Sequence, residues 1–183
     1  MSWPKIISRR TTRVSAWVDM IEREVEFGSG AVTETYYAIG QRDYVAIVAR
    51  APDGKIPIVR QFRPASEDFT WELPAGMAED GEAPADCCRR ELLEETGFTA
   101  RAVHPLGNFS PCTARLSNRI HTFFVDAVLG DGDRALDDRI EVRLVTPKEL
   151  GVLITRGEFP LQLHIGALML AALYGHLDFA ALR

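Results

Sequence analysis

The alternation of apolar and polar positions along the chain predicts both strands and helices. Short runs rich in β-branched and aromatic residues, bounded by turn residues, are typical of buried strands. Four such runs occur, at Tyr44–Ala49, Ile56–Phe62, Ile120–Val128 and Ile140–Val145. Pro52 and Gly54 favour a turn between the first two runs, so we expect these to pair as a hairpin.

Three other segments have the periodicity of helices. They are residues 83–96, Pro147–Thr155 and Leu161–Leu177, and the last of these has one apolar stripe. In the first segment, Pro84 suits the first turn of a helix and Gly97 suits its C-terminal cap. The helices and the four strands together predict an α/β sandwich with a mixed sheet.

The N-terminal part of the chain has a different pattern. Val14–Phe27 and Val32–Ile39 are typical of extended segments, and Gly28 and Gly30 separate them. They predict an N-terminal antiparallel β extension of the sandwich. The basic run Lys5–Arg13 precedes them, and we interpret it as a solvated leader.

Composition narrows the classes of function. Of 183 residues, 46% are apolar and 26% are charged, as in globular proteins that bury a core. The net charge of −5 argues against nucleic-acid and membrane-surface partners, which select for basic patches. The most apolar run, Ile165–Leu173, is too short to span a bilayer, and we find no signal peptide. Three cysteines, two of them adjacent, predict reduced thiols and a cytoplasmic protein.

The negative charge is concentrated in one segment. Residues 76–98 contain seven acidic and two basic residues, a net charge of −5, so the remaining 160 residues balance to zero. On the predicted helix, Glu91, Glu94 and Glu95 share a face, because residues three and four apart are neighbours. Arg90 lies one turn before Glu94 and can pair with it.

Glu91 and Glu95 therefore need another cation. Oxygen ligands suit a hard ion such as Mg²⁺ or Mn²⁺, and Mg²⁺ commonly bridges to substrate phosphates. The alternative interpretation is a solvated acidic helix face.

The spacing of the whole segment identifies a family. Gly76, Glu82, Arg90, Glu91, Glu94, Glu95 and Gly97, with apolar Leu92 and Phe98, match the pattern G-x5-E-x7-R-E-U-x-E-E-x-G-U, in which U is bulky and apolar. The chain thus resembles the Nudix hydrolases. The resemblance implies an α/β/α sandwich and a metal-dependent enzyme that cleaves a diphosphate linked to another group.

The resemblance also implies roles for individual residues. Glu91 and Glu95 would be the main metal ligands and Glu94 a supporting one, together with the backbone carbonyl of Ala75. Arg90 would orient the glutamates for catalysis. Glu82 would hold the loop or bind the metal through water.

The flanks of this segment resemble one branch of the family. Val59–Pro64 and Trp71–Gly76 look like the ADP-ribose pyrophosphatases and related nucleoside-diphosphate-sugar pyrophosphatases. In that branch Arg63 would contact the diphosphate, since a guanidinium fork suits two phosphate oxygens. The alternative for Arg63 is a surface salt bridge.

The same branch implies two domains and a homodimer. Residues 1–40 would be a β region exchanged between subunits, with Trp17 and Glu34 as candidates to bind the base. Residues 41–183 would be the hydrolase domain. A general base outside the acidic segment is typical of the branch, and Glu141 is our candidate, with Asp138 as the alternative.

One departure leaves the substrate open. Relatives often have Ser-Pro-Gly after the acidic segment, whereas this chain has Ser110, Pro111 and Cys112, followed by Arg115 and Arg119. Cysteine adopts left-handed backbone angles less readily than glycine. We therefore predict a Mg²⁺-dependent hydrolase of ADP-ribose or a related nucleotide sugar. The alternatives are GDP-mannose as substrate and a catalytically silent nucleotide-binding regulator.

Overall fold

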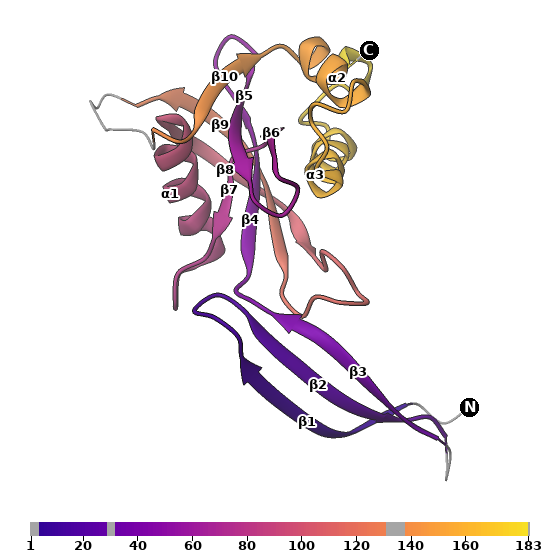
Figure 1. The fold of residues 1–183 in the computed structure, drawn as a ribbon. Coiled ribbons are helices and arrows are strands. Elements are labelled where there is room, and N and C mark those ends of the chain that lie inside the picture. Colours follow the sequence, from indigo (N-terminus) through magenta and orange to yellow (C-terminus); the bar gives the residue numbers. More distant parts are fainter. Residues whose placement is uncertain (1–3, 29–31, 131–137, 183) are drawn as a thin grey trace. The chain divides into compact units, whose positions relative to one another are not determined.

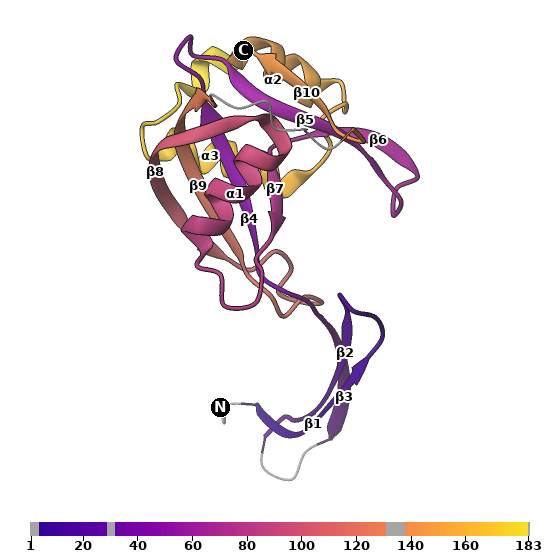
Figure 2. The same ribbon diagram turned by 90° about the vertical axis from the view of Figure 1, so that its left-hand side faces the viewer.

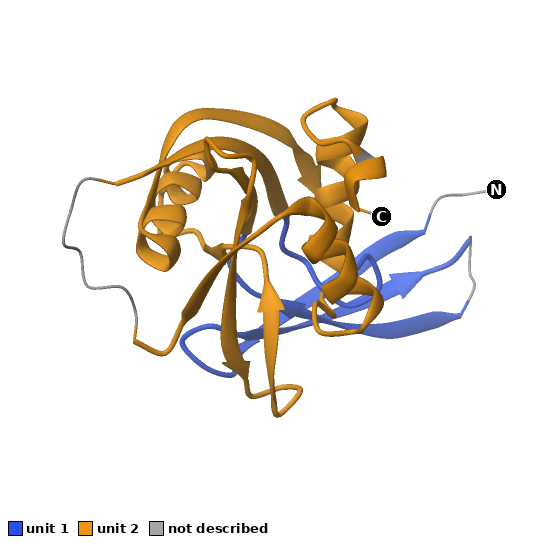
Figure 3. Ribbon diagram, turned by 90° about the horizontal axis from the view of Figure 1, so that it is seen from above, with its two compact units in different colours: residues 1–43, 110–119 blue, residues 44–109, 120–183 orange. Residues whose placement is uncertain are grey.

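The computed structural model describes residues 4–28, 32–130 and 138–182. The chain forms two compact units, coloured separately in Figure 3. One unit comprises Met1–Asp43 and Ser110–Arg119, and the other comprises Tyr44–Phe109 and Ile120–Arg183. The first unit therefore includes a loop that lies far from it in the sequence.

The first unit is a three-stranded antiparallel sheet in the order β1-β2-β3 (Figure 1). Its strands are β1 (Lys5–Arg13), β2 (Asp19–Glu26) and β3 (Thr33–Gly40). The interpretation of Lys5–Arg13 as a leader is wrong, because this run pairs with β2 along its length. Its basic and polar side chains are exposed and meet acids across the ladder: Arg10 donates to Glu22 at 2.7 Å, and Ser8 donates to Glu24 at 2.8 Å.

The second strand begins later than predicted. The amides of Val14 and Ser15 both donate to the carbonyl of Val18, at 2.9 and 3.0 Å. This closes a turn, so β2 starts at Asp19 rather than at Val14. Trp17 consequently lies in the turn between two strands.

The loop at Ser110–Arg119 is attached to β3 through backbone hydrogen bonds. The amide of Ile39 donates to Arg115 at 2.7 Å, and the amide of Ser117 donates to Ile39 at 3.1 Å. Among the described residues of this unit, only Ala38, Gly40 and Asn118 are buried. The sheet therefore has no hydrophobic core of its own.

The second unit contains two sheets. The larger has the order β7-β4-β9-β8, with β7 (Ala75–Met77), β4 (Tyr44–Arg50), β9 (Ile120–Leu129) and β8 (Phe98–Phe109). It is mixed, because β4 and β9 are parallel and the other pairs are antiparallel. The smaller is antiparallel and has the order β10-β5-β6, with β10 (Glu141–Val145), β5 (Ile56–Arg63) and β6 (Asp68–Glu72).

The predicted hairpin between Tyr44–Ala49 and Ile56–Phe62 is wrong. The turn forms, with the amide of Gly54 donating to Ala51 at 2.9 Å and the amide of Ala51 donating to Lys55 at 2.8 Å. Beyond the turn, however, β4 and β5 enter different sheets. The hairpin is excluded because β7 and β9 occupy the two edges of β4.

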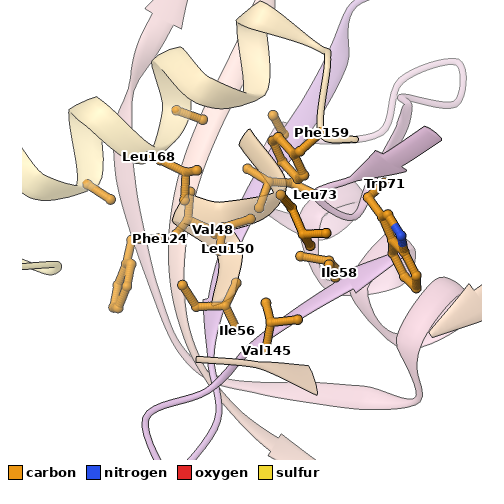
Figure 4. Packing of buried hydrophobic residues seen from close by; sticks show 14 of the residues in the cluster. Val48, Ile56, Ile58, Trp71, Leu73, Phe124, Val145, Leu150, Phe159 and Leu168 are labelled. Carbon is orange, nitrogen blue, oxygen red and sulfur yellow. The ribbon is translucent and has the colours of Figure 1, made fainter. Parts of the chain in front are cut away.

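Helices cover both faces of the larger sheet (Figures 1 and 2). Alternate residues of β4 point to opposite faces. Val45 and Ile47 pack with Cys87, Cys88 and Leu92 of α1 (Pro84–Thr96). Val48 packs on the other face with the smaller sheet, α2 (Pro147–Thr155) and α3 (Gln162–Leu173), in a core that includes Phe124, Phe159 and Leu168 (Figure 4). This confirms the predicted α/β/α sandwich.

The helix ends follow local chemistry. α1 begins at Pro84 and ends before Gly97, whose φ of 75° and amide bond to Leu93 complete a left-handed cap. Thr146 and Glu149 form a capping box at the start of α2. α3 is shorter than predicted and ends at Leu173, because Gly175 turns the chain with a φ of 79°. A 3₁₀ helix, Phe179–Leu182, follows it. In the described part of the chain, no helix has the length and apolar character needed to cross a membrane.

Candidate active site

Arg90 binds three carboxylates of the acidic segment. Its Nε and Nη2 donate to the two oxygens of Glu82, both at 2.8 Å. Its Nη1 donates to Glu91 at 2.7 Å and to Glu94 at 3.1 Å. The pairing of Arg90 with Glu94, expected from their spacing, is therefore present. Hydrogen bonds from Arg90 lower the pKa of Glu82 to about 2, and its carboxylates in turn raise the pKa of Arg90.

Glu82 and Arg90 also fix the loop that leads into α1. Glu82 accepts the amide of Glu79 at 2.9 Å, and Arg90 Nη2 donates to the carbonyl of Met77 at 3.2 Å. Both ends of the loop are thus tied to a single guanidinium. The arrangement suits the loop-holding role that the resemblance implies for Glu82.

Glu95 is the most deeply buried acid of α1, with 8% of the residue exposed. It accepts the backbone amide of Ala75 at 2.9 Å. Burial outweighs this hydrogen bond and raises the pKa of Glu95 to about 8. Burial also raises the pKa of Glu91, despite its hydrogen bond with Arg90. Both predicted main metal ligands therefore lie where a negative charge is poorly compensated.

Gly76 leaves the space that the Glu91 carboxylate occupies. A Cβ at position 76 would lie 1.9 Å from Glu91 Cδ and 2.1 Å from Oε1. Real Cβ atoms do not approach other atoms so closely, so a side chain at position 76 would displace the carboxylate. The first glycine of the acidic segment is therefore required by the placement of Glu91.

Arg63 is held by a buried carboxylate. Its Nε and Nη2 donate to the two oxygens of Glu72 at 2.8 and 2.6 Å, and the hydroxyl of Thr70 donates to Glu72 at 2.7 Å. Only 3% of Glu72 is exposed, whereas the Arg63 side chain is 41% exposed. Burial acts to raise the pKa of Glu72, but the hydrogen bonds from Arg63 and Thr70 outweigh it and lower that pKa. The pair is therefore not an ordinary surface salt bridge.

The backbone from Glu72 to Ala75 connects the Arg63–Glu72 pair with Glu95. Leu73 donates its amide to His164 Nδ1 of α3 at 3.1 Å, and Pro74 accepts the amide of Ile47 at 3.0 Å. Ala75 donates to Glu95, as described above. Sequence reasoning did not identify Glu72, Thr70 or His164 as site residues. The Trp71–Gly76 motif contains Glu72 and was the available signal for it.

Glu141 lies on the opposite face of the smaller sheet from Arg63 and Glu72. It pairs directly with Arg60 across β10 and β5, and Arg60 Nη1 donates to Glu141 at 3.4 Å. Because Arg60 and Arg63 are three residues apart on one strand, their side chains leave from opposite faces. The Glu141 side chain is 59% exposed.

Asp138 lines a cavity. The cavity has a volume of about 610 Å³ and is lined by Gln61, Phe62, Phe69, Asp138, Arg139 and Ile140. Phe62 and Phe69 are both exposed, with ring centroids 5.4 Å apart. The two candidate bases thus have different surroundings.

Trp17 and Glu34 lie in the first unit. Trp17 is exposed in the turn after β1, with the Arg42 guanidinium 5.7 Å from its ring centroid. Glu34 on β3 accepts the hydroxyl of Tyr36 at 2.8 Å. Cys112 belongs to the same unit, where its carbonyl accepts the amides of Arg115 and Leu116 at 3.3 and 3.0 Å.

The donor atoms on α1 suit a hard divalent cation. Glu91 and Glu95 offer carboxylate oxygens, and Ala75 of β7, whose amide is hydrogen-bonded to Glu95, adds a backbone carbonyl oxygen. Within the described residues, no three acidic, histidine or cysteine side chains converge as a preformed metal cluster. The reason is visible in the hydrogen bonds: Glu91 and Glu94 are directed to Arg90, and Glu95 to the amide of Ala75.

Comparisons with known proteins identify relatives of this chain. A curated relative, ADP-ribose pyrophosphatase of Bacillus subtilis (strain 168), is 32% identical over 132 residues, covering 70% of this chain and 71% of the relative. A second, CMP-5'-(N-acetyl-N-hydroxy-3-aminopropyl)phosphonate hydrolase of Streptomyces rubellomurinus (strain ATCC 31215), is 27% identical over 149 residues, which are 81% of this chain and 72% of the relative.

A solved structure described as an ADP compounds hydrolase has the same fold. It superimposes with a TM-score of 0.81 at 20% identity, covering 97% of this chain and 98% of the other. The family model described as the NUDIX domain matches residues 40–163. With the acidic segment on α1 inside this match, the chain belongs to the NUDIX family.

Proposed function

We propose that the protein is a divalent-metal-dependent pyrophosphatase that hydrolyses ADP-ribose, or a related nucleoside diphosphate sugar, to a nucleoside monophosphate and a sugar phosphate. The observation that carries the proposal is the pair of carboxylates with raised pKa, Glu91 and Glu95, held by Gly76 and Ala75. The relative from Bacillus subtilis, named as an ADP-ribose pyrophosphatase, supports the substrate class.

Glu91, Glu95 and the carbonyl of Ala75 would hold the cation, with Glu94 in support. Mg²⁺ is the expected ion and Mn²⁺ a second one. A bound divalent ion neutralises phosphate charge and lowers the pKa of bound water. Arg90 bonds to one oxygen of Glu91, Oε1, and the other oxygen would bind the cation. Arg90 would keep Glu82 and the loop in place, and Glu82 would add at most a water-mediated contact.

Arg63 would bind the diphosphate. Glu72 engages Nε and one N–H of Nη2, so the Nη1 edge has no partner among the described residues. A guanidinium fixed in this way presents its remaining donors in a set direction, which suits phosphate oxygens. Glu72 thus orients Arg63 without removing its capacity to bind substrate.

Glu141 is our proposed general base and Asp138 the alternative. A base at Glu141 requires the attacking water to be reached from the face of the smaller sheet opposite Arg63, where the Glu141 side chain is 59% exposed. Replacement of the base should lower turnover about a hundredfold or more. Glu141→Gln and Asp138→Asn, compared at saturating substrate, distinguish the two, since only one of them should have this effect.

The N-terminal region, residues 1–40, would contribute to a homodimer and to recognition of the base through Trp17 and Glu34. The sheet has no hydrophobic core of its own, and three strands need a packed hydrophobic face for independent stability, which supports the dimer. Exposed Ile6, Trp17 and Tyr37 leave apolar surface for a second copy. Sedimentation velocity measures the state directly, and a monomer across the micromolar range would exclude this assembly.

The activity is tested with a panel of ADP-ribose, GDP-mannose and UDP-glucose, in Mg²⁺, in Mn²⁺ and with chelator, with the products identified. We expect ADP-ribose to be the best substrate and the chelator to stop turnover. Faster turnover of GDP-mannose than of ADP-ribose would leave the proposed reaction unchanged and would assign substrate specificity to the loop that contains Cys112. Binding of a nucleotide without turnover would replace the enzyme with a silent regulator.

A further inference from the structure

The short backbone segment from Glu72 to Ala75 is fixed from three directions. It joins β6 to β7, two strands that belong to different sheets. Its hydrogen-bond partners come from α3 (His164), β4 (Ile47) and α1 (Glu95). Pro74 has no amide hydrogen, so the amides of Leu73 and Ala75 are the donors that this segment uses.

The bond between Leu73 and His164 is the one that no motif of the sequence explains. His164 is 1% exposed, and Leu73 is fully buried in the same core. Burial lowers the pKa of His164 to about 4, so the imidazole is neutral at neutral pH. Since Nδ1 accepts the amide of Leu73, the ring proton must lie on Nε2.

A histidine at this place is not accounted for by packing alone. The rest of this side of α3 is apolar, with Ala167, Leu168 and Ala171 buried in the core. An apolar residue would fill the space without placing polar atoms in the core, but it would leave the Leu73 amide without an acceptor. The function of His164 is therefore to hold that amide.

We propose that His164 is a positioning residue for the active site, acting through Leu73 on the two groups that flank it. On one side Glu72 orients Arg63, and on the other Ala75 meets Glu95 and supplies the proposed carbonyl ligand. A shift of the Leu73 backbone would therefore move Glu72 and Ala75 together. The inference rests on the proposed function, because that proposal assigns the roles of Arg63 and Ala75. The hydrogen bond between Leu73 and His164 is observed independently of it.

Three substitutions at position 164 distinguish the effect of losing the hydrogen-bond acceptor from the effect of changing the side-chain volume. His164→Asn places a side-chain oxygen close to the position of Nδ1 and keeps the acceptor. His164→Leu keeps most of the volume and removes the acceptor, and His164→Gln places its amide farther out, near Nε2. Leu168→Ala is the matched control, because Leu168 is also 1% exposed on α3 but packs without a hydrogen bond to the segment.

Each variant is examined by amide exchange of Leu73, by calorimetric Mn²⁺ binding without substrate, and by kcat and KM with ADP-ribose. For His164→Leu and His164→Gln we expect faster exchange of Leu73, about tenfold weaker Mn²⁺ binding and a higher KM. For His164→Asn, the Mn²⁺ affinity and the KM should both stay within about twofold of the wild-type values. Leu168→Ala should lower the melting temperature and leave Mn²⁺ affinity unchanged.

The inference is overturned if His164→Leu and His164→Gln bind Mn²⁺ as the wild type does and only their melting temperature falls, as in Leu168→Ala. If His164→Leu does not fold, the comparison of His164→Asn with His164→Gln decides in the same way. Absence of turnover in the wild type would reject the proposed function. Exchange of Leu73 and Mn²⁺ binding would still decide the role of His164.

Discussion

Two buried carboxylates, Glu72 and Glu95, differ in how the fold treats their charge. They are 3% and 8% exposed, and burial opposes ionisation of both. Glu72 receives two hydrogen bonds from Arg63 and one from Thr70, and its pKa is lowered. Glu95 receives one backbone hydrogen bond from Ala75, and its pKa rises to about 8.

The charge of Glu72 is compensated by other side chains of the protein, whereas the charge of Glu95 is not. A buried ion pair with all its hydrogen bonds is self-sufficient and serves to orient its exposed partner. A buried carboxylate without a cation is costly, and perturbed groups of this kind gather at functional sites. The Glu72 region therefore supplies geometry, and the Glu95 region is where we propose that an external cation binds.

The comparison is tested most strongly by Glu95→Gln. This change keeps an acceptor for the amide of Ala75 and removes the negative charge. We expect turnover to fall by more than about a hundredfold, since loss of a direct ligand exceeds the usual effect of outer-shell changes. Calorimetry should also show much weaker Mn²⁺ binding. Retained metal binding would place the cation elsewhere.

A second test uses the contact between Gly76 and Glu91. Gly76→Ala should displace the Glu91 carboxylate and reduce turnover about a hundredfold, with a small change in melting temperature, because only the end of a side chain has to move. Gly166→Ala is the control, since nothing lies within 4 Å of a Cβ at that position. Equal activity of the two variants would mean that Glu91 need not lie where the structure has it.

The third test breaks the self-sufficient pair. Arg63→Ala leaves Glu72 buried without its cation, and we expect about 3 kcal/mol of destabilisation and about a tenfold higher KM. Adding Glu72→Gln should restore most of the stability, because no buried charge is left uncompensated, but should not restore KM. Denaturant unfolding and steady-state kinetics on the single and double variants measure both. Restoration of KM would show that Arg63 does not bind substrate.

Local signals predicted the parts of the molecule that local chemistry determines. Pro84 and Gly97 bound α1 as expected, and Pro147 and Thr155 bound α2. The pairing of Arg90 with Glu94 followed from helix geometry alone. These features involve residues within a few helical turns of one another, so their separation in the sequence determines their separation in the structure.

Features set by distant partners could not be predicted in this way. His164 and Leu73 are 91 residues apart, and nothing in either segment indicates their bond. The turn at Gly54 suggested a hairpin, yet β9, from a much later part of the chain, takes the edge of β4. The basic charge of Lys5–Arg13 suggested a solvated leader, but an exposed edge strand can carry the same charge.

The last test concerns pH and the metal-free protein, where the change in stability over one pH unit is small. Because the pKa of Glu95 is raised from 4.5 to about 8, the folded state holds a proton that the unfolded state releases between these values. Stability should therefore fall as pH rises through this range, by about 1 kcal/mol between pH 6 and pH 7. The lowered pKa of Glu72 acts in the opposite direction, since its contribution is present above pH 4.5 and is lost as pH falls below it.

Chemical unfolding in chelator, compared with Glu95→Gln at each pH, isolates the contribution of Glu95. The variant should gain stability relative to the wild type as pH rises, and saturating Mg²⁺ should remove most of that gain by supplying the cation. Glu72→Gln should instead lose stability relative to the wild type as pH rises from 4 to 6. If both variants have the same pH dependence, the two carboxylates do not differ in charge compensation, and the assignment of the external cation to Glu95 fails.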